Sequence, residues 1–340
     1  MIRIRSSLPG RAVAACLGFV FLILASCWEG GIGELAGGGT GGTGISTGPI
    51  TGFGSVILDG EIFKTDDEVA PGFKTKKTVK GVDHPDARDR DLFRVGMLVT
   101  IRHEPAANNA SEIDYEPVLR GPVLAMSPGA EPSVVVLGRT VILGDSALFA
   151  SLGLGNVVEF SGFVDDRGRI RATYAEVTGS APAPGDEFEI KGYVTDPDPS
   201  AGTFGLGSLP DGTGSTVAVR YSPESVQGLP EDLLPGTYVQ VVTTDSQPVN
   251  GFLAASRVTL FVPRTSFPED AIASLDGLVT NPGSASGTGI TFDLEGKEVQ
   301  TTESTEFIGG TAADIRPNVR VQAHGREAGG TLSAERIVFR

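Results

Sequence analysis

The same order of short strands recurs along this chain of 340 residues, at a spacing of roughly sixty to eighty residues. The clearest copy covers residues 118–180, where apolar runs bounded by Gly and Pro predict three strands. A short helix follows from Ser146, with Asp145 as its N-cap, and two more strands come after it. Three strands, a helical turn and two strands is the order of an OB-type barrel. This recurrence restricts the chain to small barrels in series, so we predict an all-β protein.

Matching segments place further copies of this frame along the chain. The fifth-strand segments at residues 253–258 and 332–338 share nearly one pattern, and the first-strand segments at residues 190–194 and 275–279 also match. The 47 glycines and 22 prolines indicate many turns between short strands. We therefore predict four tandem OB-like units, and their boundaries are residues 49–117, 118–180, 187–262 and 270–340.

The N-terminal segment has the features of a secretory signal. Three arginines without an acidic residue precede the apolar stretch 12–25, which is shorter than the about 20 residues that a membrane helix needs. Residues 24–27, LASC, resemble a bacterial lipobox. The resemblance implies a signal peptide of residues 1–26 that is removed next to Cys27, whose thiol carries the lipid. The alternative is that Cys27 is an ordinary thiol at the edge of a cleaved signal or a membrane anchor.

The residues after Cys27 predict where such a lipoprotein would be held. Trp28 stands where, in lipoprotein families, an Asp tends to retain the protein at the inner membrane. The resemblance therefore implies a lipid anchor in the outer membrane, on its periplasmic side or on the cell surface. Residues 27–48 are rich in glycine, so they predict a flexible linker between the lipidated Cys27 and the first unit.

Two motifs carry a resemblance to a known family. Residues 52–60 read GFGSVILDG after the glycine-rich stretch, and each unit pairs a strand like VGMLV, at residues 95–99, with a later strand of pattern A..I. On these motifs the chain resembles a bacterial domain-of-unknown-function family, family 5666, found in tandem in secreted proteins and lipoproteins. The resemblance covers nearly all of the mature chain and implies tandem OB-like units, but no activity. The third unit departs from the pattern through its longer middle, residues 205–222.

Net charge and motifs limit the function. The formal charge is −15, and it becomes −18 once the three signal arginines are removed. Such a protein repels phosphates, so we expect no nucleic-acid partner. The sequence holds no GxSxG nucleophile motif and no P-loop. We therefore expect a binding or scaffolding module that is not an enzyme and uses no cofactor. Its expected partners are the membrane, through the lipid on Cys27, and envelope polysaccharide or other envelope proteins.

The middle of the first unit, residues 73–91, offers an alternative function. There Asp83, His84 and Asp86 follow a group of lysines. Carboxylates with an imidazole suit a divalent metal, so these three residues are candidate ligands in a metal-dependent envelope enzyme or a metal-binding protein. The other interpretations are a solvated loop of weakly paired charges, or lysines that bind an acidic polymer. The remaining histidines, His103 and His324, end fourth strands and are expected to be structural or solvent-facing.

The OB fold predicts where a ligand, whose identity stays unknown, would bind. OB barrels use the face of strands two and three and the loops that join strands one to two and four to five. In the second unit these loops are residues 128–132 and 165–168. Five aromatic residues could stack on sugars or could belong to the barrel cores. They are Phe160, Tyr174, Tyr193, Phe204 and Tyr238.

Overall fold

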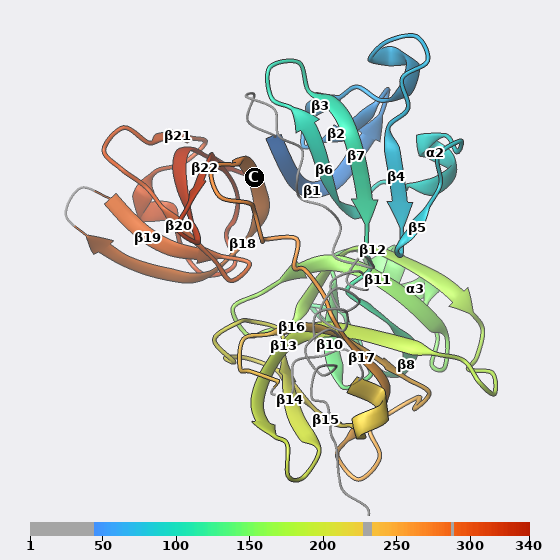
Figure 1. Cartoon of the computed structure of the whole chain (residues 1–340). Helices are drawn as coiled ribbons and strands as arrows, with labels where there is room; N and C mark the ends of the chain where they lie inside the picture. The colour runs from blue at the N-terminus through green and yellow to red at the C-terminus, as the bar shows by residue number, and fades with distance from the viewer. Residues whose placement is uncertain (1–43, 227–232, 287–288) are drawn as a thin grey trace, which may run out of the picture. The chain divides into compact units, whose positions relative to one another are not determined.

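The computed structural model describes residues 44–226, 233–286 and 289–340, all within one compact unit, Gly41–Arg340. The predicted signal peptide, Cys27 and the predicted linker up to residue 43 lie outside the described residues. The described chain consists mainly of β-strands with a few short helical turns, as predicted (Figure 1). No helix in this part of the chain is long and apolar enough to cross a membrane.

The second barrel matches the predicted order of elements. Its elements are β8 (Leu119–Ser127), β9 (Ser133–Val136), β10 (Arg139–Leu143), α3 (Ser146–Ser151), β11 (Val157–Val164) and β12 (Ile170–Gly179). The strands pair in the cyclic order one, two, three, five, four, and the fourth closes on the first. Asp145 caps the helix, because its Oδ1 accepts a hydrogen bond from the Ala147 N–H at 2.7 Å. This strand order is that of an OB barrel.

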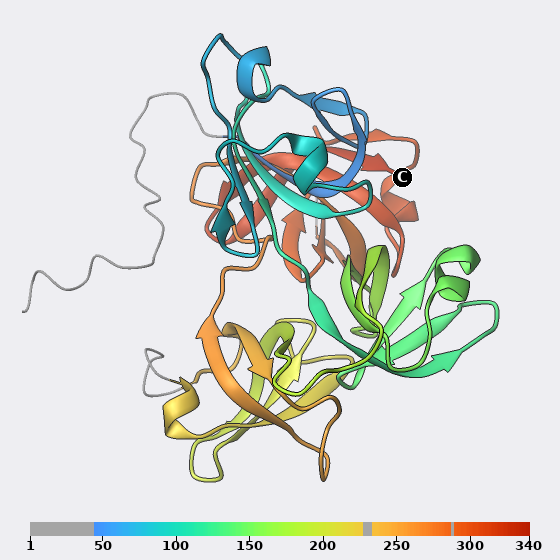
Figure 2. The same cartoon turned by 90° about the vertical axis from the view of Figure 1, so that its right-hand side faces the viewer.

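The third barrel repeats this pairing. Its elements are β13 (Phe188–Asp198), β14 (Thr203–Gly207), β15 (Thr216–Arg220), η2 (Pro223–Val226), β16 (Tyr238–Thr243) and β17 (Leu253–Leu260). The third and fifth strands again run parallel, and the fourth closes on the first. The 3₁₀ turn η2, drawn in yellow, takes the place in the chain order that α3 has in the second barrel (Figure 2).

The fourth barrel has the same closure with one strand more. Its elements are β18 (Ile272–Ser286), β19 (Gly289–Leu294), β20 (Lys297–Gln300), β21 (Glu306–Ile308), η3 (Ala312–Asp314), β22 (Arg320–Ala328) and β23 (Thr331–Phe339). The first, second, third, fifth and fourth barrel strands are β18, β19, β20, β23 and β22, in pairing order. The added strand β21 pairs in parallel with β23.

The first barrel carries the long middle segment that the sequence indicated. Its elements are β1 (Gly44–Phe53), β2 (Val56–Leu58), β3 (Glu61–Phe63), η1 (Asp66–Glu68), β4 (Lys76–Val79), β5 (Val82–Asp83), α2 (Asp89–Leu92), β6 (Leu98–Glu104) and β7 (Asn109–Tyr115). Ladders join β1 to β2 and β6, β2 to β3, and β6 to β7. A single bridge, Lys64 to Asn109, closes the ring. The hairpin of β4 and β5 adds to its edge at β7.

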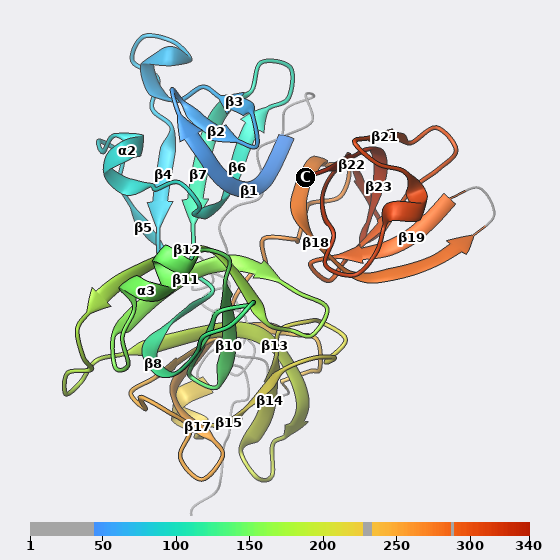
Figure 3. The ribbon, with the colours of Figure 1, turned by 180° about the vertical axis from the view of Figure 1, so that it is seen from behind.

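Strand pairing between barrels joins them in two pairs. β8 of the second barrel pairs with β13 of the third. β1 of the first barrel pairs in parallel with β18 of the fourth, from Gly44 with Ile272 to Thr47 with Leu275 (Figure 3). This corrects the predicted linker at its end, because residues 44–48 are strand and not a flexible tether. Their backbone is hydrogen-bonded to β6 on one side and to β18 on the other.

The apolar cores follow these pairs. One buried cluster runs through the second and third barrels, and it includes Phe160 from one and Phe204 from the other. The first barrel has its own cluster around Phe63. Ile45 of β1 belongs to the cluster of the fourth barrel, although β1 is a strand of the first. The first and last barrels therefore share a strand, and the middle barrels share a core.

Candidate functional site

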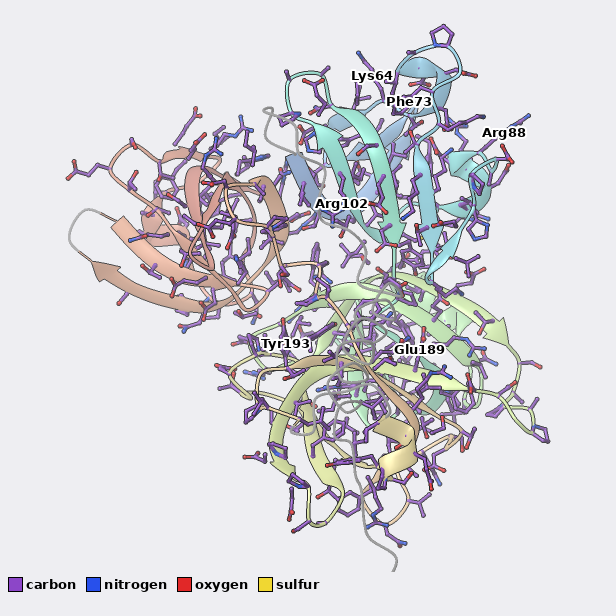
Figure 4. All side chains as sticks on the ribbon, viewed as in Figure 1. Lys64, Phe73, Arg88, Arg102, Glu189 and Tyr193 are labelled. Atoms are coloured by element: carbon purple, nitrogen blue, oxygen red, sulfur yellow. The ribbon has the colours of Figure 1, made fainter. Side chains whose placement is uncertain are left out.

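The loop proposed as a metal site does not bring its ligands together. Asp83 is the register partner of Thr78 in the hairpin of β4 and β5, and it accepts a hydrogen bond from Thr78 Oγ1 at 2.9 Å. Asp83 and Asp86 are exposed, and His84 is half-buried. All three precede Arg88 in the sequence, and Arg88 is labelled in Figure 4. Among the described residues, no group of three or more His, Cys, Asp or Glu side chains is placed to hold a metal ion. The predicted metal site is therefore not formed, since the hairpin turns Asp83 toward a hydroxyl.

Three of the four lysines of this segment, residues 74–80, are paired with carboxylates. The ion pairs are Lys76 with Glu112 at 2.9 Å, Lys77 with Asp89 at 3.2 Å, and Lys80 with Glu159 at 2.7 Å. Lys77 is almost completely buried and also donates to Asp66 and to the carbonyl of Ala87. These lysines hold the insert of the first barrel together and bind it to the second, so they are not a free basic patch for an acidic polymer.

One of the two predicted ligand loops of the second barrel is engaged by the chain itself. Asp166 N–H donates to Oδ1 of Asn318 in the fourth barrel at 3.0 Å, and Asn318 Nδ2 donates back to Asp166 at 2.9 Å. Ser215 N–H of the third barrel donates to the carbonyl of Arg167 at 2.9 Å. Residues 128–131, in the other loop, are exposed. The hairpin of β11 and β12 is thus a contact between barrels.

The aromatic residues are divided between core and junction. Phe160, Phe204 and Tyr193 are buried, as the core interpretation predicts. Figure 4 labels Tyr193. The rings of Tyr193 and Tyr238 lie 4.7 Å apart, and Tyr174 is half-buried. Three of the five are therefore core residues, whereas Tyr174 and Tyr238 remain partly exposed.

A buried carboxylate at the tip of the hairpin of β11 and β12 connects the second barrel, the fourth barrel and the segment between the third and fourth barrels. Glu295 has a left-handed backbone, with φ 54°, and is 6% exposed. It accepts hydrogen bonds from the Val164 N–H at 3.0 Å and the Leu278 N–H at 3.1 Å, and its other partner is Arg264 at 2.5 Å. Burial raises the pKa of Glu295, and Arg264 with the two N–H groups opposes that shift. Removing this side chain would leave two buried donors without a partner.

A second buried polar cluster ties the first barrel to the fourth. Arg320 donates to Asp276 at 3.0 Å and to Asp59 at 2.6 Å. Burial raises the pKa of Asp276 to about 8, the facing carboxyl of Asp59 adds to the shift, and Arg320 opposes it. The guanidinium groups of Arg320 and Arg264 lie 5.1 and 5.9 Å from the ring of Phe163, which the second barrel contributes.

A polar row crosses the seam where β1 pairs with β18, and we call the cavity above it the seam pocket. Ser46 pairs with Ser274, Ser274 with His324, His324 with Arg336, and Arg336 with Glu306. Register partners project from the same face of a sheet, so these five side chains form one line. All of them line a pocket of about 360 Å³, whose other polar side chains are Glu61, His103, Asn108 and Glu335.

His103 fixes the wall of the seam pocket on the side of the first barrel. It is 7% exposed, its Nε2 lies 3.1 Å from Ser46 Oγ, and its ring meets that of Phe63 edge-on at 4.9 Å. A Cβ at Gly44 would lie 2.5 Å from this ring, which explains the glycine at the start of β1. Burial lowers the pKa of His103, and two nearby carboxylates, Glu61 and Glu104, oppose the shift.

The sequence did not identify the seam pocket as a site. The sequence predicts that His103 and His324 are structural or solvent-facing, and that Ser46 belongs to the linker. The only available signal was a histidine near the end of the fourth strand in both the first and the last unit. The pairing of β1 with β18 joins residues more than 200 positions apart, and that pairing cannot be read from either segment alone.

Comparisons with known proteins give a similar solved structure and a match to a family model. Among solved structures, the chain is similar to one described as "drosophila Unr CSD456", at 16% sequence identity over 62% of this chain and 90% of that chain, with a TM-score of 0.18. No curated protein matches the chain. Residues 276–338 match the model of a family described as Domain of unknown function (DUF5666). This stretch runs from β18 into β23 and holds most of the closed fourth barrel, so this barrel matches the family that the sequence motifs resemble.

Proposed function

We propose that the chain is a lipid-anchored protein of the cell envelope that acts as a binding or scaffolding module. The observation that carries this proposal is the order of the N-terminal residues: arginines, an apolar stretch, LASC ending at Cys27, and a glycine-rich segment. That segment leads directly into β1, which starts at Gly44. A lipid on Cys27 would then be connected to the barrels through this segment. The residue after Cys27 is Trp28 and not an Asp, which favours the outer membrane.

The contacts between barrels support a scaffolding role. Glu295 and Arg320 each bind residues of more than one barrel, and Glu159 of the second barrel pairs with Lys80 of the first at 2.7 Å. Buried polar contacts of this kind specify one arrangement more than they add stability. A module whose barrels support one another would present its exposed surfaces together to a partner.

Charge and pocket chemistry support a binding role without nucleic acid. The net charge of −15 opposes a phosphate backbone. The lysines at residues 76, 77 and 80 are neutralised by carboxylates, so they leave little basic surface there. Envelope polysaccharide or other envelope proteins remain the proposed partners. The seam pocket is the proposed place for a small ligand, because it combines two imidazoles, carboxylates and hydroxyls in one cavity.

Membrane fractionation of a Cys27→Ser variant tests the anchor. We expect the parent protein in the membrane pellet, labelled when cells are fed radioactive palmitate, and the variant unlabelled and unprocessed. Cys16→Ser is the matched control, because Cys16 lies in the apolar stretch that cleavage would remove. That control should fractionate and label like the parent. A parent protein that takes up no palmitate would refute the proposed anchor.

A further inference from the structure

We propose that the seam pocket binds a small organic cation, whose ammonium or guanidinium group donates hydrogen bonds to the imidazole of His324 and to the carboxylates that line the pocket. This inference rests on the binding role proposed above and names the chemical class of the ligand. It does not depend on the lipid anchor.

The first argument is that the pocket offers more acceptors than donors. Ser46 and His103 already bond to each other at 3.1 Å, and Asn108 Nδ2 donates to Glu61 Oε1 at 3.0 Å. The imidazole of His324 forms no hydrogen bond within the described part of the chain, although it lies in the middle of the polar row. A neutral imidazole has one nitrogen that accepts a hydrogen bond, and each carboxylate has two accepting oxygens. A ligand rich in N–H groups therefore complements this lining best.

The lining of the seam pocket carries an excess of negative charge. Its walls carry three carboxylates, Glu61, Glu306 and Glu335, and one guanidinium, Arg336. No ion pair between these four groups, or from them to other described residues, is formed. The excess of negative charge at the pocket adds to the negative field of the whole protein, which raises the local concentration of cations. An anionic or neutral ligand would gain nothing from this field.

The third argument is that the histidines do not repel a cation at neutral pH. Burial lowers the pKa of His324 to about 4, and the nearby positive charges of Arg336 and Arg340 add to the shift. Burial also lowers the pKa of His103, against the opposing effect of Glu61 and Glu104. Both rings are therefore neutral at pH 7, and the ring of His324 offers an accepting nitrogen. A neutral imidazole next to a carboxylate gives a charge-assisted site for an ammonium or guanidinium group.

The volume of the seam pocket suits a small molecule. The pocket of about 360 Å³ falls at the small end of the range of roughly 300–1,000 Å³ that small-molecule sites occupy. Polar and apolar surface contribute about equally to its lining, and Ile272 and Pro105 supply part of the apolar contact. A short aliphatic chain ending in one or two cationic groups matches this combination. A metal ion alone would not use the volume, and its ligand geometry is absent among the described residues.

Isothermal titration calorimetry on the purified full chain in detergent tests the inference. The probes are spermidine and agmatine, with sorbitol as an uncharged molecule and citrate as an anion. We expect one saturable site for at least one of the two cations at pH 7, and no heat of binding for sorbitol or citrate. His324→Leu and the double variant Glu306→Gln/Glu335→Gln should each weaken binding roughly tenfold, the effect of losing one charge-assisted hydrogen bond.

The matched control is Glu298→Gln/Glu303→Gln. It removes the same charge from exposed positions of the same barrel outside the pocket, and it should bind like the parent. Equal weakening in the control and the pocket variants would mean nonspecific attraction and would overturn the inference, as would failure of both cations to bind the parent. Thermal melting checks that each variant is folded. Membrane fractionation of the same proteins separates the two proposals, because loss of the cation site leaves anchoring unchanged.

Discussion

The two junctions between paired barrels differ in what they bury. The second and third barrels share one apolar cluster, and the guanidinium of Arg139, which is 1% exposed, donates to the carbonyl of Leu206 across their junction at 2.6 Å. The first and fourth barrels share a strand, and their seam carries a row of hydroxyl, imidazole and charged groups. One junction therefore excludes water and contributes stability. The other leaves polar groups accessible, which is what a binding site needs.

The largest effect is expected in the shared core. Phe204→Ala removes a ring that is 1% exposed, so it should lower the free energy of unfolding by about 3–5 kcal/mol. Because the cluster is continuous, the second and third barrels should lose stability together. Urea denaturation combined with hydrogen exchange on β8 and β13 measures this. Faster exchange in β13 with unchanged exchange in β8 would show that the two cores are independent.

A smaller effect is expected at the seam. Ile45→Ala deletes the one side chain of β1 that packs in the core of the fourth barrel, and it should cost about 2–4 kcal/mol. Hydrogen exchange should accelerate in β18 and β22, although the substitution is in a strand of the first barrel. Ile62→Ala, at a side chain that is 55% exposed, is the control and should change stability little. Exchange that rises only in β6 and β7 would show that the strand is not shared.

A third effect, a pH dependence of stability, is expected from Asp276 beside the seam. Its folded pKa of about 8 lies above the ordinary value of 3.8, so the folded state holds its proton more tightly than the unfolded state. This contribution to stability is present at low pH and is lost as the pH rises from about 4 through 8. Asp276→Asn should remove it, which changes the relative stability of parent and variant by several kcal/mol over this range, since one pKa unit corresponds to about 1.4 kcal/mol.

Denaturation of parent and variant at pH 5, 7 and 9 measures that difference. The comparison cancels the contributions of other groups with raised pKa values, such as Asp114, whose pKa burial raises to about 6. Parallel curves for the two proteins would contradict the assignment to Asp276.

Sequence patterns predict the features that depend on residues close together in the chain. The strand order of the second barrel and the Asp145 cap depend on neighbours within a few residues, so alternation and turn residues were sufficient. The start of β1 was missed because GISTG, at residues 44–48, has the composition of a linker. Only pairing with β6 and β18 makes it a strand. The same distant pairing assembles the seam pocket, whereas the Asp83 loop looked like a site because its residues are adjacent in sequence.

The central claim is that Cys27 carries a lipid that ties these barrels to the envelope membrane. Intact-mass measurement of the protein isolated from native membranes tests it most directly. The account predicts a chain that starts at Cys27, lacks the preceding 26 residues and carries the added mass of acyl chains. A mass that corresponds to a chain from Met1 with an unmodified thiol would contradict it.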